Sequence, residues 1–262
     1  ILLVFMPSCK EKLKPQKIDP GFAAYVISFT SGIVSSNSAV QVRLVAEVPG
    51  AVPGNTLSFN PFSFSAEIKG QSKWVDKQTI QFVPFEKLPA GEIYTVNFEL
   101  DKFVKVPEKF STLTFRFQVK NQGIRFEFNG ISPMIENDMT RQRIRGVIYT
   151  ADYAVDSLIE KAFSISGDDA SNTFKWKHNS GSNVHEFSIE NVERRNLPYK
   201  LKIKWDGRMI GAKSDGSWEF EMPALNDFKV IYVKTSSDPK TSVDVFFSDP
   251  LSTLQDINGL VK

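Results

Sequence analysis

The chain contains the alternating segment Thr112-Leu-Thr-Phe-Arg-Phe-Gln-Val119, in which every second side chain is apolar and the others are polar. A period of two places the apolar side chains on one face of an extended strand and the polar ones on the other. The same alternation occurs at 40–44, 80–82 and 94–100. Turn-forming stretches that contain proline and glycine separate these runs. The spacing therefore predicts half-buried strands, paired in an antiparallel β-sandwich.

The alternating pattern restarts twice along the chain. Strands that open at Phe22, Ile124 and Phe228 are each followed by a polar turn and another alternating strand. Their separation of about 100 residues is typical of tandem domains. We therefore expect an all-β chain of tandem antiparallel β-sandwiches that resemble the immunoglobulin (Ig) fold. The expected domains are 22–120, 121–227 and the truncated start of a third at 228–262.

One short helix is expected in the second domain. Val155, Leu158, Ile159 and Ala162 fall at helical spacing, and Asp152 is the expected N-cap. The helix is interpreted as a cover for one end of the sandwich. A helix that docks a partner is the alternative.

Composition excludes several classes of function. The 262 residues carry 32 Lys+Arg against 30 Asp+Glu, a net charge of +2, so no nucleic-acid footprint is expected. One cysteine cannot form an internal disulfide or a Cys-rich zinc site. With two histidines, His-rich metal chemistry is disfavoured. We expect no cofactor and no metal.

The N-terminal residues resemble the end of a bacterial lipoprotein signal. Residues 1–9 are apolar up to Met6 and end on the unique Cys9, which is the expected lipid attachment site. This run is far shorter than the roughly 20 apolar residues that span a bilayer. A buried first strand with an ordinary free thiol is the alternative. Residues 10–21 are charged and contain two prolines, which predicts a flexible tether.

The sequence offers no recognisable catalytic constellation. It contains no G-x-S-x-G elbow and no phosphate-binding glycine-rich loop. His178 and His185 have no nucleophile nearby in the sequence and are interpreted as solvent-facing strand or turn residues. We therefore expect no enzyme activity and no catalytic residue.

Two groups of residues are candidates for an interaction surface. Trp205 ends a strand and Trp218 precedes an alternating pair, so both are candidates for partial exposure and for binding a sugar or a partner loop. Arg141, Arg143 and Arg145 alternate along one run and, as a strand, place three guanidinium groups on one face. This basic face is either simply solvated or an interaction site.

The first domain also contains a more specific pattern. It reads Thr79-Ile-Gln-Phe82-Val-Pro84, then Leu88-Pro-Ala-Gly91-Glu-Ile-Tyr94-Thr-Val96. This is similar to bacterial Ig-like modules with the motif T-x-x-F-x-P followed by L-P-x-G-x-x-Y-x-V. Such modules open bacterial, bacteroidete-type members of the α-2-macroglobulin family, between a lipoprotein signal and further macroglobulin-type sandwiches. The segments 146–161 and 243–261 resemble the next two domains of those proteins, in order.

The resemblance implies a large, lipid-anchored, broad-spectrum protease inhibitor of the cell envelope. In that family a bait segment is cut, the molecule collapses around the protease, and an internal thioester can couple to it. This chain has no C-x-E-Q thioester motif. It is expected to be the non-catalytic, anchor-proximal fragment, which meets target proteases through the rest of the protein. Cys9 alone is carried over, as the membrane anchor, and Lys10 favours the outer membrane, with a periplasmic or surface-facing orientation.

A lipid-anchored Ig-like surface module is the alternative function. It would recognise a glycan or another protein, in the manner of an adhesin. An exposed groove at Trp205 and Trp218 that binds oligosaccharide would favour this interpretation.

Overall fold

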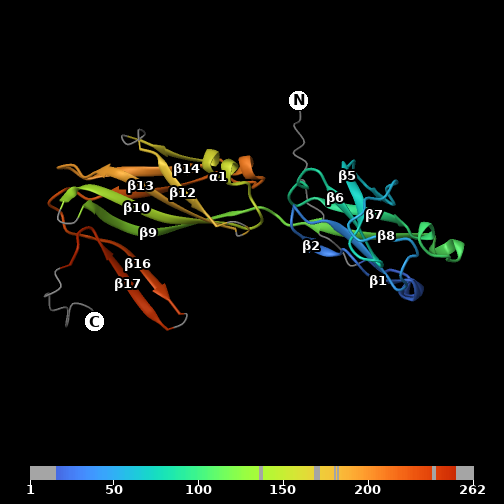
Figure 1. Cartoon of the computed structure of the whole chain (residues 1–262). Coiled ribbons are helices and arrows are strands. Elements are labelled where there is room, and N and C mark those ends of the chain that lie inside the picture. The colour runs from blue at the N-terminus through green and yellow to red at the C-terminus, as the bar shows by residue number, and fades with distance from the viewer. Residues whose placement is uncertain are drawn as a thin grey trace, which may run out of the picture. The chain divides into compact units, whose positions relative to one another are not determined.

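The computed structural model describes residues 16–135, 138–167, 172–179, 181, 183–237 and 240–251. These form two compact units, which divide between Asn121 and Gln122 (Figure 1). Both units are built from packed β-sheets, so the prediction of all-β, Ig-like sandwiches is confirmed. Cys9 and the apolar run before it lie outside the described residues. No helix in the described part of the chain is long and apolar enough to cross a membrane.

Two four-stranded sheets make up the first unit. The first has the order β1-β3-β6-β5, with bounds Val26–Phe29, Val40–Leu44, Thr79–Pro84 and Gly70–Trp74. The second has the order β2-β8-β7-β4, with bounds Gly32–Val34, Thr112–Val119, Ile93–Glu99 and Phe62–Phe64. All of these pairs are antiparallel except β2 with β8, which is parallel. The chain therefore changes sheet between β1 and β2.

The alternating segment 112–119 forms β8 and supplies the centre of the first core. Leu113, Phe115, Phe117 and Val119 are each 0% exposed. Each buried phenylalanine contributes roughly 1.5–3 kcal/mol by removing its ring from water. The polar residues between them lie on the other face, so the period of two decides which side of the sheet is covered.

The residues before β1 are held against the first sandwich. Gln16 donates from Nε2 to the carbonyl of Thr114 at 3.0 Å, and Ile18 packs against the core. A 3-10 helix, η1 (Pro20–Ala24), then begins after Asp19, whose side chain accepts from the amide of Gly21. The expected tether 10–21 therefore does not extend to residue 21, because apolar contact and capping order its last part. Further 3-10 turns in this unit are η2 (Leu100–Lys102) and η3 (Glu108–Phe110).

The second unit packs a four-stranded sheet against a three-stranded one. The larger has the order β12-β13-β10-β9, with bounds Phe174–His178, Val184–Glu193, Asp138–Thr150 and Ile124–Ile135. The smaller has the order β11-β14-β15, with bounds Phe163–Ser166, Tyr199–Trp205 and Gly216–Met222. A 3-10 turn, η4 (Gly207–Ile210), follows β14.

The expected helix is present as α1, Asp156–Ala162, and buries Ile159 and Ala162. Its N-cap is Val155, and the expectation that Asp152 caps it is wrong. Asp152 is buried one turn earlier, where its amide donates to Oε1 of Gln122 at 2.9 Å. The helix therefore begins later in the sequence than a cap at Asp152 would place it.

A hairpin of β16 (Val230–Ser236) and β17 (Ser242–Phe247) follows the second sandwich and belongs to the same compact unit. Tyr232 contacts Phe128 edge to face at 5.7 Å. Phe246 lies over Gly130, where an added Cβ would stand 2.9 Å from the ring and φ is +96°. The described part of the expected third domain is thus a hairpin seated on β9. A separate third domain at 228–262 stays a prediction.

Candidate functional site

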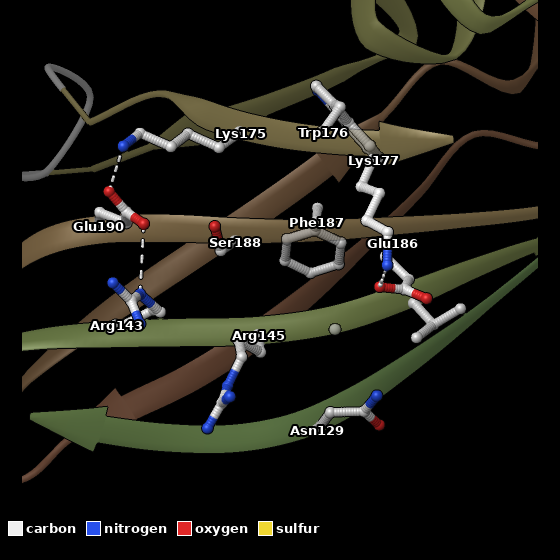
Figure 2. Close-up of a pocket in the computed structure, with 12 residues that line it drawn as sticks. Asn129, Arg143, Arg145, Lys175, Trp176, Lys177, Glu186, Phe187, Ser188 and Glu190 are labelled. Carbon is white, nitrogen blue, oxygen red and sulfur yellow. Dashed lines mark hydrogen bonds and ion pairs between the residues drawn. The ribbon is translucent and has the colours of Figure 1, made fainter. Parts of the chain in front are cut away.

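The outer face of the sheet β12-β13-β10-β9 carries the densest set of charged side chains that the sequence analysis pointed to (Figure 2). Because successive residues of a strand point to opposite faces, the odd-numbered residues of β10 and β12 and the even-numbered residues of β13 up to Glu190 point outward. They line a shallow depression of about 860 Å³. Its charged residues are Arg143, Arg145, Lys175, Lys177, Glu186 and Glu190.

Glu190 is the acceptor at one end of this depression. It pairs with Lys175, and its Oε1 lies 3.2 Å from Nε of Arg143 in a second ion pair (Figure 2). The ammonium group of Lys175, followed by Arg143, holds the pKa of Glu190 below its ordinary value. Glu190 lies on β13, and its carboxylate pairs with one cation on each neighbouring strand, Lys175 on β12 and Arg143 on β10.

Two further cations extend the face. Lys177 pairs with Glu186 at 3.4 Å, and Nη2 of Arg145 reaches Oγ of Ser132 at 3.5 Å. The six charged residues comprise four cations and two anions, so the depression carries an excess of two positive charges at neutral pH. Within the described residues, no ion pair that includes Arg145 is found.

The three arginines of β10 lie on the same, outward face of the strand. Arg141 and Arg145 are exposed and Arg143 is half-buried, whereas Gln142 and Ile144 between them are fully buried. Arg141 donates from Nη1 to the carbonyl of Asn191 at 3.3 Å. It therefore lies beyond the depression, next to the irregular end of β13.

Trp205 and Trp218 do not join the arginines. They lie on β14 and β15, half-buried, and both stack on Phe126 in the second core, at 6.0 and 4.9 Å between ring centres. Both residues are partly exposed, as the sequence allowed, and a role for them in binding a sugar or a partner loop stays a prediction. Their rings fill the space between the sheets because they alternate with the exposed lysines and glutamates of the same strands.

The two histidines also differ from the sequence-based interpretation. His178 on β12 and His185 on β13 are opposite each other in the strand register and face the inside of the sandwich. Their Nδ1 atoms are 2.9 Å apart, and His185 is only 1% exposed. Burial, followed by the neighbouring His178, lowers the pKa of His185 below 6.5. These are therefore not solvent-facing residues.

A signal for this arrangement was present in the sequence. In 174–178 the aromatic residues alternate with lysines and end on His178, and in 185–189 His185 starts an alternation with Phe187 and Ile189. Both histidines therefore occupy the apolar phase of their strands. What the sequence could not supply is the strand register that makes them partners.

Helix α1 brings two carboxylates to the histidine pair. Oδ1 of Asp156 lies 3.6 Å from Nδ1 of His178 and 3.8 Å from Nδ1 of His185. Oε1 of Glu160, one turn later, accepts from Nε2 of His178 at 3.1 Å. The end of the second sandwich thus gathers two imidazoles and two carboxylates, in which His178 is hydrogen-bonded to His185 and to Glu160 and Asp156 lies within 3.8 Å of both imidazoles.

No protein-family model matches the chain, and no curated protein matches it. Among solved structures, it is similar to L,D-transpeptidase 3 from Mycobacterium tuberculosis, with a TM-score of 0.29 and 12% identity over 62% of this chain and 55% of that one. A fragment of titin domains I67–I69 gives a TM-score of 0.25 and 9% identity over 75% and 62%. Domains 4–9 of the surface layer protein SbsC give 0.26 and 10% over 81% and 32%. The chain thus spans about half the length of the transpeptidase, and likenesses this weak support no inference about activity, ligands or partners.

Proposed function

We propose that the chain is the non-catalytic, anchor-proximal part of a bacterial α-2-macroglobulin-like protease trap in the cell envelope. Its two sandwiches would space the trapping machinery from a membrane to which the protein is attached by a lipid on Cys9. Target proteases would be met by the rest of the protein.

One observation carries this proposal. The residues that define the bacterial Ig-like motif fall together in a single core: Phe82, Leu88, Tyr94 and Val96 are all at most 4% exposed. The motif therefore corresponds to a folded unit, because its apolar positions are the ones that the two sheets bury against each other. This supports the use of the motif as a domain signature, on which the family resemblance depends.

The full-length protein, including everything encoded after Lys262, tests this role. It is mixed with a protease, and cleavage of a large protein substrate is compared with cleavage of a short chromogenic peptide. A protease enclosed by a trap loses access to the large substrate and keeps most of its activity on the peptide. Equal cleavage of both substrates with and without the protein would overturn the proposal.

A second function is favoured by the charged depression on the outer face of the second sandwich. Its two excess positive charges, beside the small floor residues Gly146 and Ser188, fit an anionic glycan better than a neutral one. In this alternative the chain is a lipid-anchored surface module that binds such a glycan through Arg143, Arg145, Lys175 and Lys177.

A pair of charge-matched variants separates this function from non-specific attraction. Arg145→Ala with Lys177→Ala removes two cations from the depression, and Lys69→Ala with Lys77→Ala removes two from the first unit. With heparin as the probe, the first variant should lose affinity by about tenfold and the second should bind like the parent protein. Equal losses in both variants would indicate non-specific binding only.

A further inference from the structure

The end of the second sandwich that lies under α1 contains a set of metal-ligand atoms. We define the histidine cluster as Asp156, His178 and His185, with Glu160 behind it. The sheet supplies both imidazoles from opposite positions on β12 and β13. The first turn of α1 supplies the Asp156 carboxylate, so three separate elements converge on one point.

The three facing atoms have the dimensions of a zinc site. Nδ1 of His178, Nδ1 of His185 and Oδ1 of Asp156 are separated by 2.9, 3.6 and 3.8 Å. The circle through the three atoms has a radius of about 2.0 Å, so its centre lies about 2.0 Å from each of them. Zinc binds imidazole nitrogen at about 2.0–2.1 Å and carboxylate oxygen at about 2.0–2.2 Å. The ligand atoms are thus already spaced for an ion of this size.

The surroundings also fit a bound imidazole. When Nδ1 of a histidine binds a metal, its Nε2 carries the proton and usually donates it to a carboxylate or carbonyl. Nε2 of His178 faces Oε1 of Glu160 at 3.1 Å, which is this arrangement. Trp176 lies nearly parallel to the ring of His178, with 5.7 Å between ring centres, and limits its rotation. Nδ1 of His185 faces Nδ1 of His178 at 2.9 Å, and its Nε2 is buried with no hydrogen-bond partner among the described residues.

We propose that Asp156, His178 and His185 bind one zinc ion, with Glu160 as the residue that orients His178. Two imidazoles and a carboxylate form a donor set that zinc commonly takes. The side chain of Asp156 is 55% exposed, which leaves the fourth position of the ion open to solvent. The ion would tie α1 to the edge of the sheet. This inference does not depend on the proposed function.

The geometry also indicates what must adjust on binding. The two imidazole nitrogens subtend about 90° at the equidistant point, less than the tetrahedral angle. Separation of His178 and His185 by a few tenths of an ångström opens this angle. His178 lies on the edge strand β12 and Asp156 on a seven-residue helix, so both have room to move. His185 is fixed by its burial on β13.

The experiment is a titration of the purified 262-residue chain with Zn²⁺, after removal of metals with a chelator. Isothermal titration calorimetry should give one ion per chain, and zinc should raise the unfolding temperature by mass action. Substitution of Co²⁺ should produce the visible absorption of a four-coordinate cobalt ion with nitrogen and oxygen ligands. Absence of saturable binding of either ion would overturn the proposal.

Four variants identify the ligands. Asp156→Asn and His178→Gln should each weaken zinc binding by more than tenfold and remove the cobalt spectrum, and neither replaces a fully buried side chain. Glu160→Gln should keep one ion per chain and weaken affinity by about 10- to 100-fold. Glu186→Gln is the matched control, since it follows His185 on β13 but points to the opposite face. If Asp156→Asn and His178→Gln bind zinc as tightly as Glu186→Gln does, the ion is bound elsewhere and the assignment is wrong.

Discussion

Arg194 is fully buried and donates from Nη1 to Oδ1 of Asp249 at 2.5 Å. Its guanidinium group also donates to the carbonyls of Pro223, Ala224 and Asp227, at 3.4, 2.7 and 3.2 Å. Arg194 directly follows β13, and Asp249 follows β17, so this ion pair fastens the base of the β16–β17 hairpin to the second unit. A single buried side chain thus satisfies four acceptor groups.

Replacement of Arg194 should therefore release the hairpin. Arg194→Met removes the cation that pairs with Asp249 and the donor to three carbonyls, although the hydroxyl of Ser248 still donates to Asp249 and Asp227. Loss of one partner of a buried ion pair typically costs roughly 3–5 kcal/mol. Urea unfolding measures this loss, and hydrogen exchange should become faster in β16 and β17. Arg208→Met is the control, because Arg208 is mostly exposed and water screens its pairing with Asp206, which therefore adds little to stability. A variant at 194 as stable as that control would contradict this account.

Gly146 is a second position where the second unit should tolerate no change. A Cβ there would lie 2.5 Å from Cζ of Phe187 and 2.7 Å from the carbonyl oxygen of Glu127. Since the second contact is with backbone, Gly146→Ala should lower the free energy of unfolding by roughly 1–3 kcal/mol. At Gly123 the nearest atom would be Cβ of Ala151 at 3.7 Å, so Gly123→Ala should be close to neutral. Urea denaturation of the two variants compares them, and equal stability would show that the strand moves freely at Gly146.

Asp76 should make the first unit sensitive to acid. Its carboxylate accepts from the amides of Gln78 and Thr79, both at 2.7 Å, and from the hydroxyl of Thr79 at 3.0 Å. The hydrogen bond from Gln78 is the main reason that the pKa of Asp76 lies below its ordinary value of 3.8. The stabilisation is thus present above pH 3.8 and is lost as the pH falls through the lower folded-state value.

Asp76→Asn tests this linkage. The variant should be less stable than the parent by about 1 kcal/mol at pH 7, because a charged acceptor is replaced by a neutral one. The difference should shrink as the pH falls below 3.8, since Asp76 itself becomes neutral there. Thermal unfolding between pH 7 and pH 2.5 measures both values. Asp101→Asn changes an exposed carboxylate and should give no such convergence; a pH-independent difference for Asp76→Asn would refute the mechanism.

Membrane attachment through Cys9 can be tested in cells that carry the complete gene. Cys9→Ala should move the protein from the membrane fraction to the soluble fraction, because a lipid chain supplies binding energy of about 0.8 kcal/mol for each buried CH₂ group. Ser8→Ala keeps the cysteine and should remain with the membrane. If Cys9→Ala is retained to the same extent, the lipoprotein assignment is wrong.

Strands in which buried and exposed side chains alternate were predicted well from the sequence. The segment 112–119 became β8 with all four apolar side chains buried, because a period of two is a local property that each strand carries by itself. The helix at 156–162 was found from its apolar spacing in the same way. Its start was not, since the amide of Asp152 donates to the side chain of Gln122, which lies 30 positions away in the sequence.

The sites were predicted poorly because they depend on register. Alternation along β10 predicts that Arg143 and Arg145 point to the outer face. It does not predict their partners Glu190 and Ser132, which lie on two other strands. His178 and His185 are seven residues apart and meet only because one hairpin register sets them opposite each other. The contact of Arg194 with Asp249 spans 55 residues and leaves no local pattern at all.

The parallel pairing of β2 with β8 has a mechanical consequence. Once β1 has separated from β3, tension along the chain would pull β2 by its first residue and β8 by its last, in opposite directions along strands that run side by side. The bonds that join 32–34 to 117–119 then lie across the direction of pull and must break together. Antiparallel strands peeled apart from one end lose their bonds one after another. This strand pair therefore resists extension of the first unit by shear, whereas the antiparallel pairs of the same sheets can separate from one end.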